Sequence, residues 1–149
     1  MRTRPDTPSP FICLTLIAFT FAIGCGGREF ETAAASGVVT LDGKPVTSGS
    51  VVFTPEQGWP AQGELDAEGR FVLSTFEDAD GAIVGEHRVA VIAQTGEDAS
   101  QHFEKPPTQP VRSLVPDRYA SKMTSGLLVE VRPGAENDFE LKLTSQKQR

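Results

Sequence analysis

The sequence predicts an all-β domain, a seven-stranded antiparallel Greek-key sandwich, preceded by a cleaved signal peptide. Three observations favour this fold class. Hydrophobic residues recur at alternate positions in short runs, which is the period of a half-buried strand. Turn residues separate these runs, and no stretch has convincing helical periodicity. The segment 37–144 also has the commonest length of one domain, about 100 residues, and suits a sandwich of this kind.

Four strands are expected in the first half of the domain. They are 37–41, 50–54, 61–65 and 70–75. Asp42-Gly43 follows the first of them and is the strongest short turn signal. Residues 66–69, Asp-Ala-Glu-Gly, are expected to join the third and fourth strands into a hairpin. Val51 and Phe53 share one face of the second strand, so we expect both in the core.

Three further strands are expected in the second half. They are 86–92, 127–132 and 138–143. Alternate residues from His87 to Val91 share one face of the first, and Ala90 and Ile92 cover the other, so this strand is predicted to be central and buried on both faces. The last two strands are expected to pair as a hairpin across 133–136. In the long loop 93–126, the half that carries Tyr119 is expected to pack against the end of the sandwich.

Residues 1–24 have the three-part pattern of an export signal. Arg2 and Arg4 give a positive start, an apolar run ends at Ile23, and the small Gly24 follows. The apolar run would span about 20 Å as a helix, less than the roughly 30 Å of a bilayer core. We therefore predict a cleaved signal peptide and no permanent membrane-spanning anchor.

The segment Phe21-Ala22-Ile23-Gly24-Cys25 resembles the lipobox of bacterial lipoproteins, Leu-(Ala/Ser)-(Gly/Ala)-Cys, with Ala22 in place of the leucine. The resemblance implies that Cys25 becomes the first mature residue, with diacylglycerol on its sulfur and an acyl chain such as palmitate on its amine. Two or more chains anchor a protein stably. We expect the protein at the cell membrane or outer membrane, and Gly26 favours the outer one by analogy with Gram-negative sorting. The alternative is a secreted protein with a free Cys25.

Residues 25–36 are expected to form the lipidated cysteine and a linker long enough to hold the domain tens of Å from the membrane. Residues 145–149 are expected to be a polar tail. Loss of the signal peptide removes Cys13, so no internal disulfide is expected. It also leaves 12 basic and 19 acidic residues, a net charge of -7 against -6 for the whole chain. Such a chain is not expected to bind nucleic acid.

Three segments in order resemble the signatures of carboxypeptidase regulatory-like domains. They are Gly-Val-Val-Thr-Leu-Asp-Gly-Lys-Pro-Val at 37–46, Asp-Ala-Glu-Gly-Arg-Phe at 66–71 and Gly-Glu-His-Arg-Val-Ala-Val at 85–91. The chain looks most like small bacterial lipoproteins that share a segment like 116–127. The resemblance implies a prealbumin-like sandwich with a role in binding, folding support or spacing. Two features differ from the peptidase-associated members: Gly49 stands where they commonly have alanine, and no Gly-Tyr pair follows Ile92. These differences favour a relationship with the lipoproteins.

No catalytic residue, metal or cofactor is predicted. His87 and His102 are the only histidines, and neither lies in a His-Glu-x-x-His arrangement. We interpret His87, in phase with Val89, as a core-edge residue, because a catalytic base would need a partner. The enzyme alternative is the transthyretin-like hydrolase of purine breakdown, which has a related sandwich. Its C-terminal Tyr-Arg-Gly-Ser signature is missing from 143–149.

The acidic segment 77–81, Glu-Asp-Ala-Asp-Gly, resembles part of a calcium loop. A full loop needs six or more oxygen ligands and a later glutamate, whereas this chain soon enters the strand expected from Glu86. We interpret the segment as a solvated turn in which Gly81 takes a positive φ angle.

Trp59, between Gly58 and Pro60 in an expected loop, is a candidate platform for a sugar ring. Phe76 and Tyr119 would join it only if the fold brings the three loops together. The alternative role for Trp59 is a plug over the end of the core. These three aromatic residues are the candidate ligand-binding site.

Together these features predict a lipid-anchored cell-envelope β-sandwich with a non-catalytic binding or structural role. Its expected partners are the membrane, through Cys25, and an envelope protein or a glycan. The main alternative is a carbohydrate-binding module built on Trp59 and neighbouring loops. The hydrolase is a distant alternative.

Overall fold

The computed structural model describes residues 30–95 and 112–146, which form short strands and one 3₁₀ helix. The strands are β1 (Thr32–Ala33), β2 (Ala35–Leu41), β3 (Lys44–Pro45), β4 (Ser50–Pro55), β5 (Ala61–Glu64), β6 (Arg70–Val72), β7 (Ala82–Ile83), β8 (Gly85–Ile92), β9 (Gln94–Thr95), β10 (Arg112–Ser113), β11 (Leu127–Val131) and β12 (Asn137–Leu143), and the 3₁₀ helix is Asp117–Ala120. The predicted signal peptide, Cys25 and half of the long loop lie outside the described residues.

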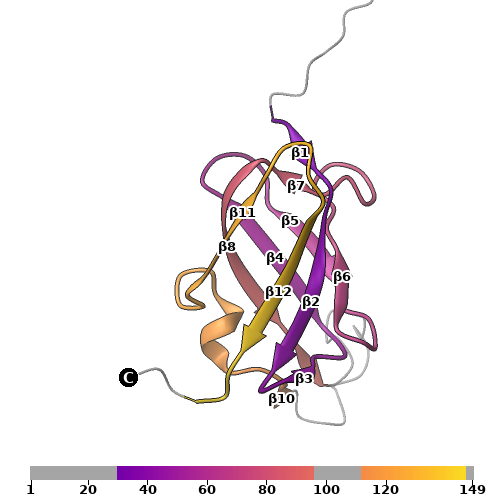
Figure 1. Cartoon of the computed structure of the whole chain (residues 1–149). Coiled ribbons are helices and arrows are strands. Elements are labelled where there is room, and N and C mark those ends of the chain that lie inside the picture. The colour runs from indigo at the N-terminus through magenta and orange to yellow at the C-terminus, as the bar shows by residue number, and fades with distance from the viewer. Residues whose placement is uncertain (1–29, 96–111, 147–149) are drawn as a thin grey trace, which may run out of the picture.

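Two sheets face each other across the core (Figure 1). One is antiparallel, in the order β11-β8-β4-β5. In the other, β2 is central, with β12 on one edge and β3 and β6 on the other. All seven expected strands are present, as β2, β4, β5, β6, β8, β11 and β12. The prediction of an all-β fold is confirmed.

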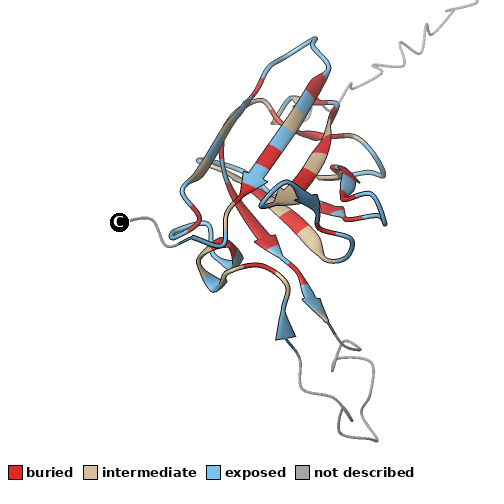
Figure 2. Ribbon diagram, turned by 60° about the horizontal axis from the view of Figure 1, so that its bottom comes forward, coloured by how far each residue is buried: buried red, intermediate tan, exposed pale blue. Residues whose placement is uncertain are grey.

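The core is built from alternate residues of these strands, and Figure 2 shows buried positions alternating with exposed ones along them. Phe53 of β4 is fully buried, and its ring centroid lies 5.8 Å from Phe71 and 5.5 Å from Phe139, both in the facing sheet. Tilted ring contacts at this spacing are favourable. Full burial of a phenylalanine contributes about 1.5–3 kcal/mol, so Phe53 is a main link between the two sheets.

The predicted hairpin between the last two strands is wrong. β11 pairs with β8 in one sheet, whereas β12 pairs with β2 in the other. The β12–β2 pairing is parallel, with Phe139 opposite Gly37 and Leu141 opposite Val39, so the sandwich is not antiparallel throughout. Residues 133–136 therefore carry the chain from one sheet to the other. In both strands inward residues still alternate with exposed ones, because alternation fixes the buried face but not the neighbouring strand.

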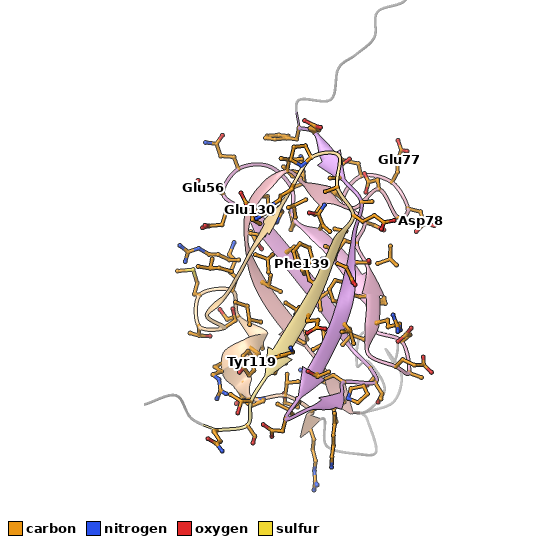
Figure 3. All side chains as sticks on the ribbon, viewed as in Figure 1. Glu56, Glu77, Asp78, Tyr119, Glu130 and Phe139 are labelled. Atoms are coloured by element: carbon orange, nitrogen blue, oxygen red, sulfur yellow. The ribbon has the colours of Figure 1, made fainter. Side chains whose placement is uncertain are left out.

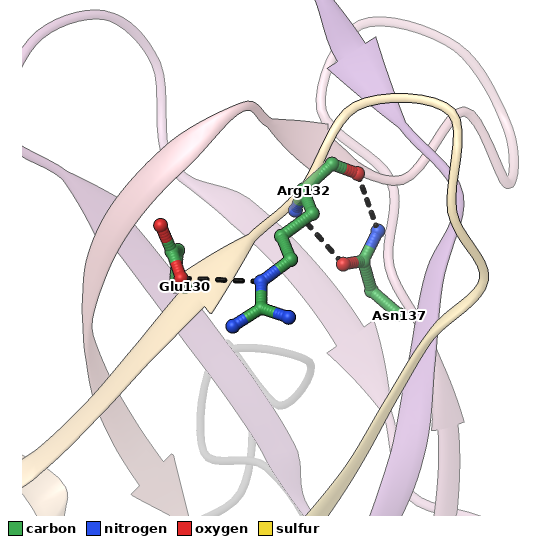
Figure 4. Close-up of polar contacts among 3 residues, drawn as sticks. All are labelled: Glu130, Arg132 and Asn137. Carbon is green, nitrogen blue, oxygen red and sulfur yellow. Dashed lines mark hydrogen bonds and ion pairs between the residues drawn. The ribbon is translucent and has the colours of Figure 1, made fainter.

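The side chain of Asn137 holds this crossover together (Figure 4). Its Oδ1 accepts the Arg132 backbone N–H at 2.9 Å. Its Nδ2 donates to the backbone carbonyls of Ala34 at 3.0 Å, Arg132 at 3.1 Å and Ala135 at 3.2 Å. A buried amide thus satisfies backbone groups that no strand ladder reaches.

Strand β8 is central, as predicted, because it pairs with both β4 and β11. The prediction that both of its faces are buried is wrong for most of the second face. His87, Val89 and Val91 are fully buried, whereas on the other face Ala90 is buried but Arg88 and Ile92 are exposed. An antiparallel sheet of a sandwich commonly leaves one face in water. Ile92 lies on this outer face and is exposed although it is apolar.

Two turns explain how the first strands connect. Asp42 and Gly43 have φ angles of 50° and 80°, and the predicted turn between β2 and β3 is confirmed. At the next predicted turn, Oδ1 of Asp66 accepts the backbone N–H groups of Glu68 and Arg70. The flanking strands diverge after this turn, because β5 pairs with β4 and β6 pairs with β2. The expected hairpin is reduced to a bridge between Gln62 and Ser74.

Strand pairing begins before Gly37, so the second part of the predicted linker 25–36 belongs to the fold. β1 pairs with β7, with Thr32 opposite Ile83, and β2 starts within the expected linker. Ala33 is buried, and a Cβ on Gly81 would lie 1.9 Å from its carbonyl oxygen. The small residues of this segment therefore permit close backbone packing.

Candidate functional site

Trp59 lies in the β4–β5 loop and is 66% exposed. A Cβ on Gly58 would lie 2.7 Å from Cδ1 of Ile83 and 3.2 Å from the Phe30 ring, so the loop rests directly on these two side chains. Pro60 follows and restricts Trp59 to extended backbone angles. The indole is therefore held outward by a supported loop, and its exposure excludes the alternative that it plugs the end of the core.

Tyr119 lies at the opposite end of the sandwich, in the 3₁₀ helix, and is only 3% exposed. Its hydroxyl accepts the Thr144 backbone N–H at 3.0 Å, just after β12. The Arg118 guanidinium lies 4.5 Å from the Tyr119 ring centroid and donates to the carbonyls of Thr144 and Gln146. The prediction that this part of the long loop packs against the sandwich is confirmed. A buried Tyr119 offers no ring face to a ligand.

Phe76 lies in the β6–β7 loop and is 42% exposed. Asp80 organises this loop, because its carboxylate accepts the backbone N–H groups of Thr75 at 2.7 Å and Phe76 at 3.1 Å. Gly81 has a φ angle of 85°, which confirms the turn predicted there. The Asp80 carboxylate thus serves the backbone of its own loop. Among residues 30–95 and 112–146, no group of three or more His, Cys, Asp or Glu side chains is placed to hold a metal ion.

The three predicted site residues are therefore not brought together. Glu56, Glu77 and Asp78 lie at the end of the sandwich away from Tyr119, as Figure 3 shows. Glu56 and Trp59 share the β4–β5 loop, and Phe76 shares the β6–β7 loop with the other two acidic residues. The resulting surface, which we name the Trp59 end, carries an exposed indole beside negatively charged side chains.

His87 is fully buried in the core. Its Nε2 lies 2.6 Å from the Ile83 carbonyl oxygen, and since a carbonyl only accepts, Nε2 carries the proton. The Phe53 ring lies 6.0 Å away. These contacts agree with the core role assigned to His87, which lies deeper than the predicted core edge. They do not supply the carboxylate or the nucleophile that a catalytic base requires.

A groove with a volume of about 540 Å³ lies between β5 and β6, where the two strands diverge. Glu64, Asp66 and Asp78 line it together with Arg70. The Asp66 carboxylate is engaged by its own turn, as described above. Ser74 also lines the groove, and its Oγ accepts the Ala79 backbone N–H at 2.9 Å. The groove therefore holds ordinary surface charges and no activated nucleophile.

Two structurally important residues were missed by the sequence reasoning. Asn137 bridges the sheets, and Arg118 closes the end of β12. Asn137 sits in phase with the inward residue Phe139, and a polar residue at an inward position is a signal that could have identified it. Arg118 has no such signal, because its partners are backbone carbonyls distant in sequence.

Comparison with known proteins adds little. No protein-family model matches the chain, and no curated protein matches it significantly. Among solved structures it is similar to a 9R-lipoxygenase from Cyanothece PCC8801, with a TM-score of 0.36 and 19% identity. The match covers 76% of this chain but 16% of that one, so the chain spans only a small part of the lipoxygenase. A similarity this low carries no argument about function.

Proposed function

We propose that this protein is a lipid-anchored β-sandwich of the bacterial cell envelope with a non-catalytic binding or structural role. The observation that carries the proposal is the motif Phe21 to Cys25 at the end of an apolar leader. In the described residues no helix is long and apolar enough to cross a bilayer. Acyl chains on Cys25 would supply stable attachment.

A non-catalytic role is supported by what the candidate groups do. His87 is a core residue bonded to a backbone carbonyl, and Ser74, Asp66 and Asp80 bond backbone N–H groups of their own turns. Each of these groups is thus hydrogen-bonded to the backbone of the fold. A catalytic site needs a nucleophile or base that is free to reach a substrate.

The finer fold proposed here is a Greek-key, carboxypeptidase regulatory-like sandwich. It is supported by the two facing sheets and by the order of the segments 37–46, 66–71 and 85–91. The parallel pairing of β12 with β2 is a feature that this assignment must accommodate.

The proposal is tested by fractionating cells that produce the tagged protein and its Cys25→Ser variant. The wild type is expected with the membranes, and the variant is expected in the soluble envelope fraction. Metabolic labelling with a fatty-acid analogue should mark only the wild type. A Cys25→Ser protein that still fractionates with membranes would contradict the anchoring.

In-cell crosslinking followed by mass spectrometry then tests the role. A single dominant envelope protein captured by the anchored form would support an assembly or accessory role. The Cys25→Ser variant is the matched control, because it differs only in attachment. Hydrolytic turnover by the purified domain would contradict a non-catalytic role.

A second candidate function is glycan binding, which the exposure of Trp59 favours. An outward indole can stack on the apolar face of a sugar ring. Trp59→Ala should then abolish sugar affinity in calorimetry, while Met123→Ala, another exposed apolar position at 71% exposure, should not change it. Because Tyr119 is buried at the other end, the site would have to be built without it.

A further inference from the structure

The Trp59 end is also the end at which the chain enters the domain (Figure 1). Phe30 is half-buried and packs on the Gly58 backbone, next to Trp59 in the same loop. Glu31 follows, and its carbonyl oxygen accepts the Val84 backbone N–H at 2.9 Å. The entering chain is therefore fixed to the fold from Phe30 onward, directly beside the loop that carries the exposed indole.

Chain length limits how far this end lies from the anchor. Phe30 is five residues after Cys25, and a fully extended chain covers at most about 3.3–3.6 Å per residue, or roughly 17 Å. An acylated Cys25 lies at the surface of the bilayer, since its chains enter the hydrocarbon. The Trp59 end is thus confined to a short distance from the lipid headgroups, whatever the path of the connecting residues.

Tryptophan is suited to that location, because its amphipathic ring is favoured at the membrane–water interface. Among the described residues at the opposite end, Tyr119 is buried and the 66–69 turn exposes Asp66, Ala67 and Glu68. An exposed Trp59 is otherwise unfavourable in water, where large apolar side chains gain nothing from exposure.

The acidic side chains at the Trp59 end favour a lipid surface without net negative charge. Glu56, Glu77 and Asp78 are negative and lie at the Trp59 end (Figure 3), where Glu56 shares a groove with Arg88 and Lys122. Anionic lipids give a membrane a negative surface potential, which attracts basic segments and repels acidic ones within about 10 Å at ordinary ionic strength. A zwitterionic surface has no such net repulsion.

We propose that Trp59 inserts its indole into a zwitterionic headgroup layer beside the anchored Cys25, so that the sandwich is oriented with β1 and β7 toward the membrane. This inference rests on the proposed lipid anchoring. The partner is the lipid surface, and neither a glycan nor a second copy of the chain is needed.

The chain is well suited to a direct test, because Trp59 is its only tryptophan. The acylated protein is reconstituted into phosphatidylcholine–phosphatidylethanolamine vesicles, with and without brominated lipid. Its emission is expected to shift to shorter wavelength than that of the untethered Cys25→Ser protein, and brominated lipid is expected to quench it. Raising the share of phosphatidylglycerol should reduce both effects.

A matched control moves the probe to the far end of the molecule. The double variant Trp59→Phe, Ala67→Trp places the only indole on the exposed turn between β5 and β6. A Cβ on the neighbouring Gly69 would lie 3.2 Å from Pro45 of β3, which places this turn at the β3 end of the sandwich. Its emission should be the same with brominated and ordinary lipid, although the protein is equally anchored.

Flotation with the vesicles distinguishes a failure of the proposed acylation of Cys25 from a failure of the proposed insertion of Trp59. If the native protein fails to float, the proposed acylation is wrong, and a maleimide lipid coupled to Cys25 then supplies the tether for the same fluorescence test. If the tethered protein floats but Trp59 is not quenched, the inference is overturned. An emission shift that requires added glycan, or one that depends on protein concentration, would also overturn it.

Discussion

Replacing Asn137 with alanine is expected to weaken the crossover between the two sheets. The side chain is buried, with 8% exposure. It accepts the Arg132 N–H at 2.9 Å and donates to three backbone carbonyls at 3.0–3.2 Å, those of Ala34, Arg132 and Ala135. Alanine removes the amide and all of these hydrogen bonds while leaving the backbone of β12 intact.

The expected loss in the free energy of unfolding follows from the number of hydrogen bonds that the substitution removes. Oδ1 makes one bond, and the two hydrogens of Nδ2 allow at most two full bonds among three carbonyls, so about three bonds are lost at a net of about 1 kcal/mol each. Residues 133–136 are exposed, so in the variant water replaces some of these bonds. We therefore expect the free energy of unfolding to fall by about 2–3 kcal/mol.

Urea unfolding followed by far-ultraviolet circular dichroism measures this loss. The matched control is Asp138→Ala, the next residue along β12, which is exposed. An exposed substitution away from special features usually changes stability by less than about 0.5 kcal/mol. If Asn137→Ala loses no more stability than Asp138→Ala, the proposed role of the amide in joining the sheets is refuted.

Three other substitutions test separate parts of the structure. Gly37→Ala would place a Cβ 2.2 Å from the Phe139 carbonyl oxygen, and the forced shift of the β2–β12 ladder should cost about 1–3 kcal/mol in the same assay. Tyr119→Phe removes the hydroxyl that holds the end of β12 and should cost about 1 kcal/mol. Side-chain and backbone hydrogen bonds from Ser145 lower the pKa of Asp42. The ionised Asp42 carboxylate therefore stabilises the fold above its unfolded pKa of about 3.9, and this stabilisation is lost as pH falls through the folded pKa. The amide resonance of Ser145 should shift as Asp42 is protonated, and Asp42→Asn should abolish this pH-dependent shift.

The strands were predictable from sequence because alternation and turn chemistry are local. The periodicity of Val51 and Phe53 and the Asp42-Gly43 turn identify strands and ends without reference to the rest of the fold. The partner of each strand is not local information. Residues 127–131 and 137–143 present the same alternation whether they pair with each other or with β8 and β2, and only the packed core decides between these arrangements.

The candidate site shows the same limit. Exposure of Trp59 follows from the support of its loop by Ile83 and Phe30, which are separated from it by more than twenty residues. The predicted site of three aromatic residues does not form, because Tyr119 lies at the other end of the sandwich and is hydrogen-bonded to the backbone after β12. Neither contact leaves a pattern in the nearby sequence.

The strands that begin at Thr32 shorten the tether that the proposed anchor at Cys25 would provide. With a linker of 25–36 the domain would stand tens of Å from the bilayer, whereas only four residues lie between Cys25 and Phe30. Local concentration at a tethered surface falls roughly as the −3/2 power of tether length, so a tether three times as long lowers it about fivefold.

Insertion of about ten Gly and Ser residues between Cys25 and Phe30 makes that change without altering the fold or the acylation motif. We expect quenching of Trp59 by brominated lipid to decrease markedly in the insertion variant, while flotation with vesicles stays complete. A Glu56→Gln change in the same variant should recover part of the quenching on anionic vesicles, because it removes one negative charge from the Trp59 end. Quenching that is unchanged by the insertion would mean that the short tether is not what brings the indole to the lipid.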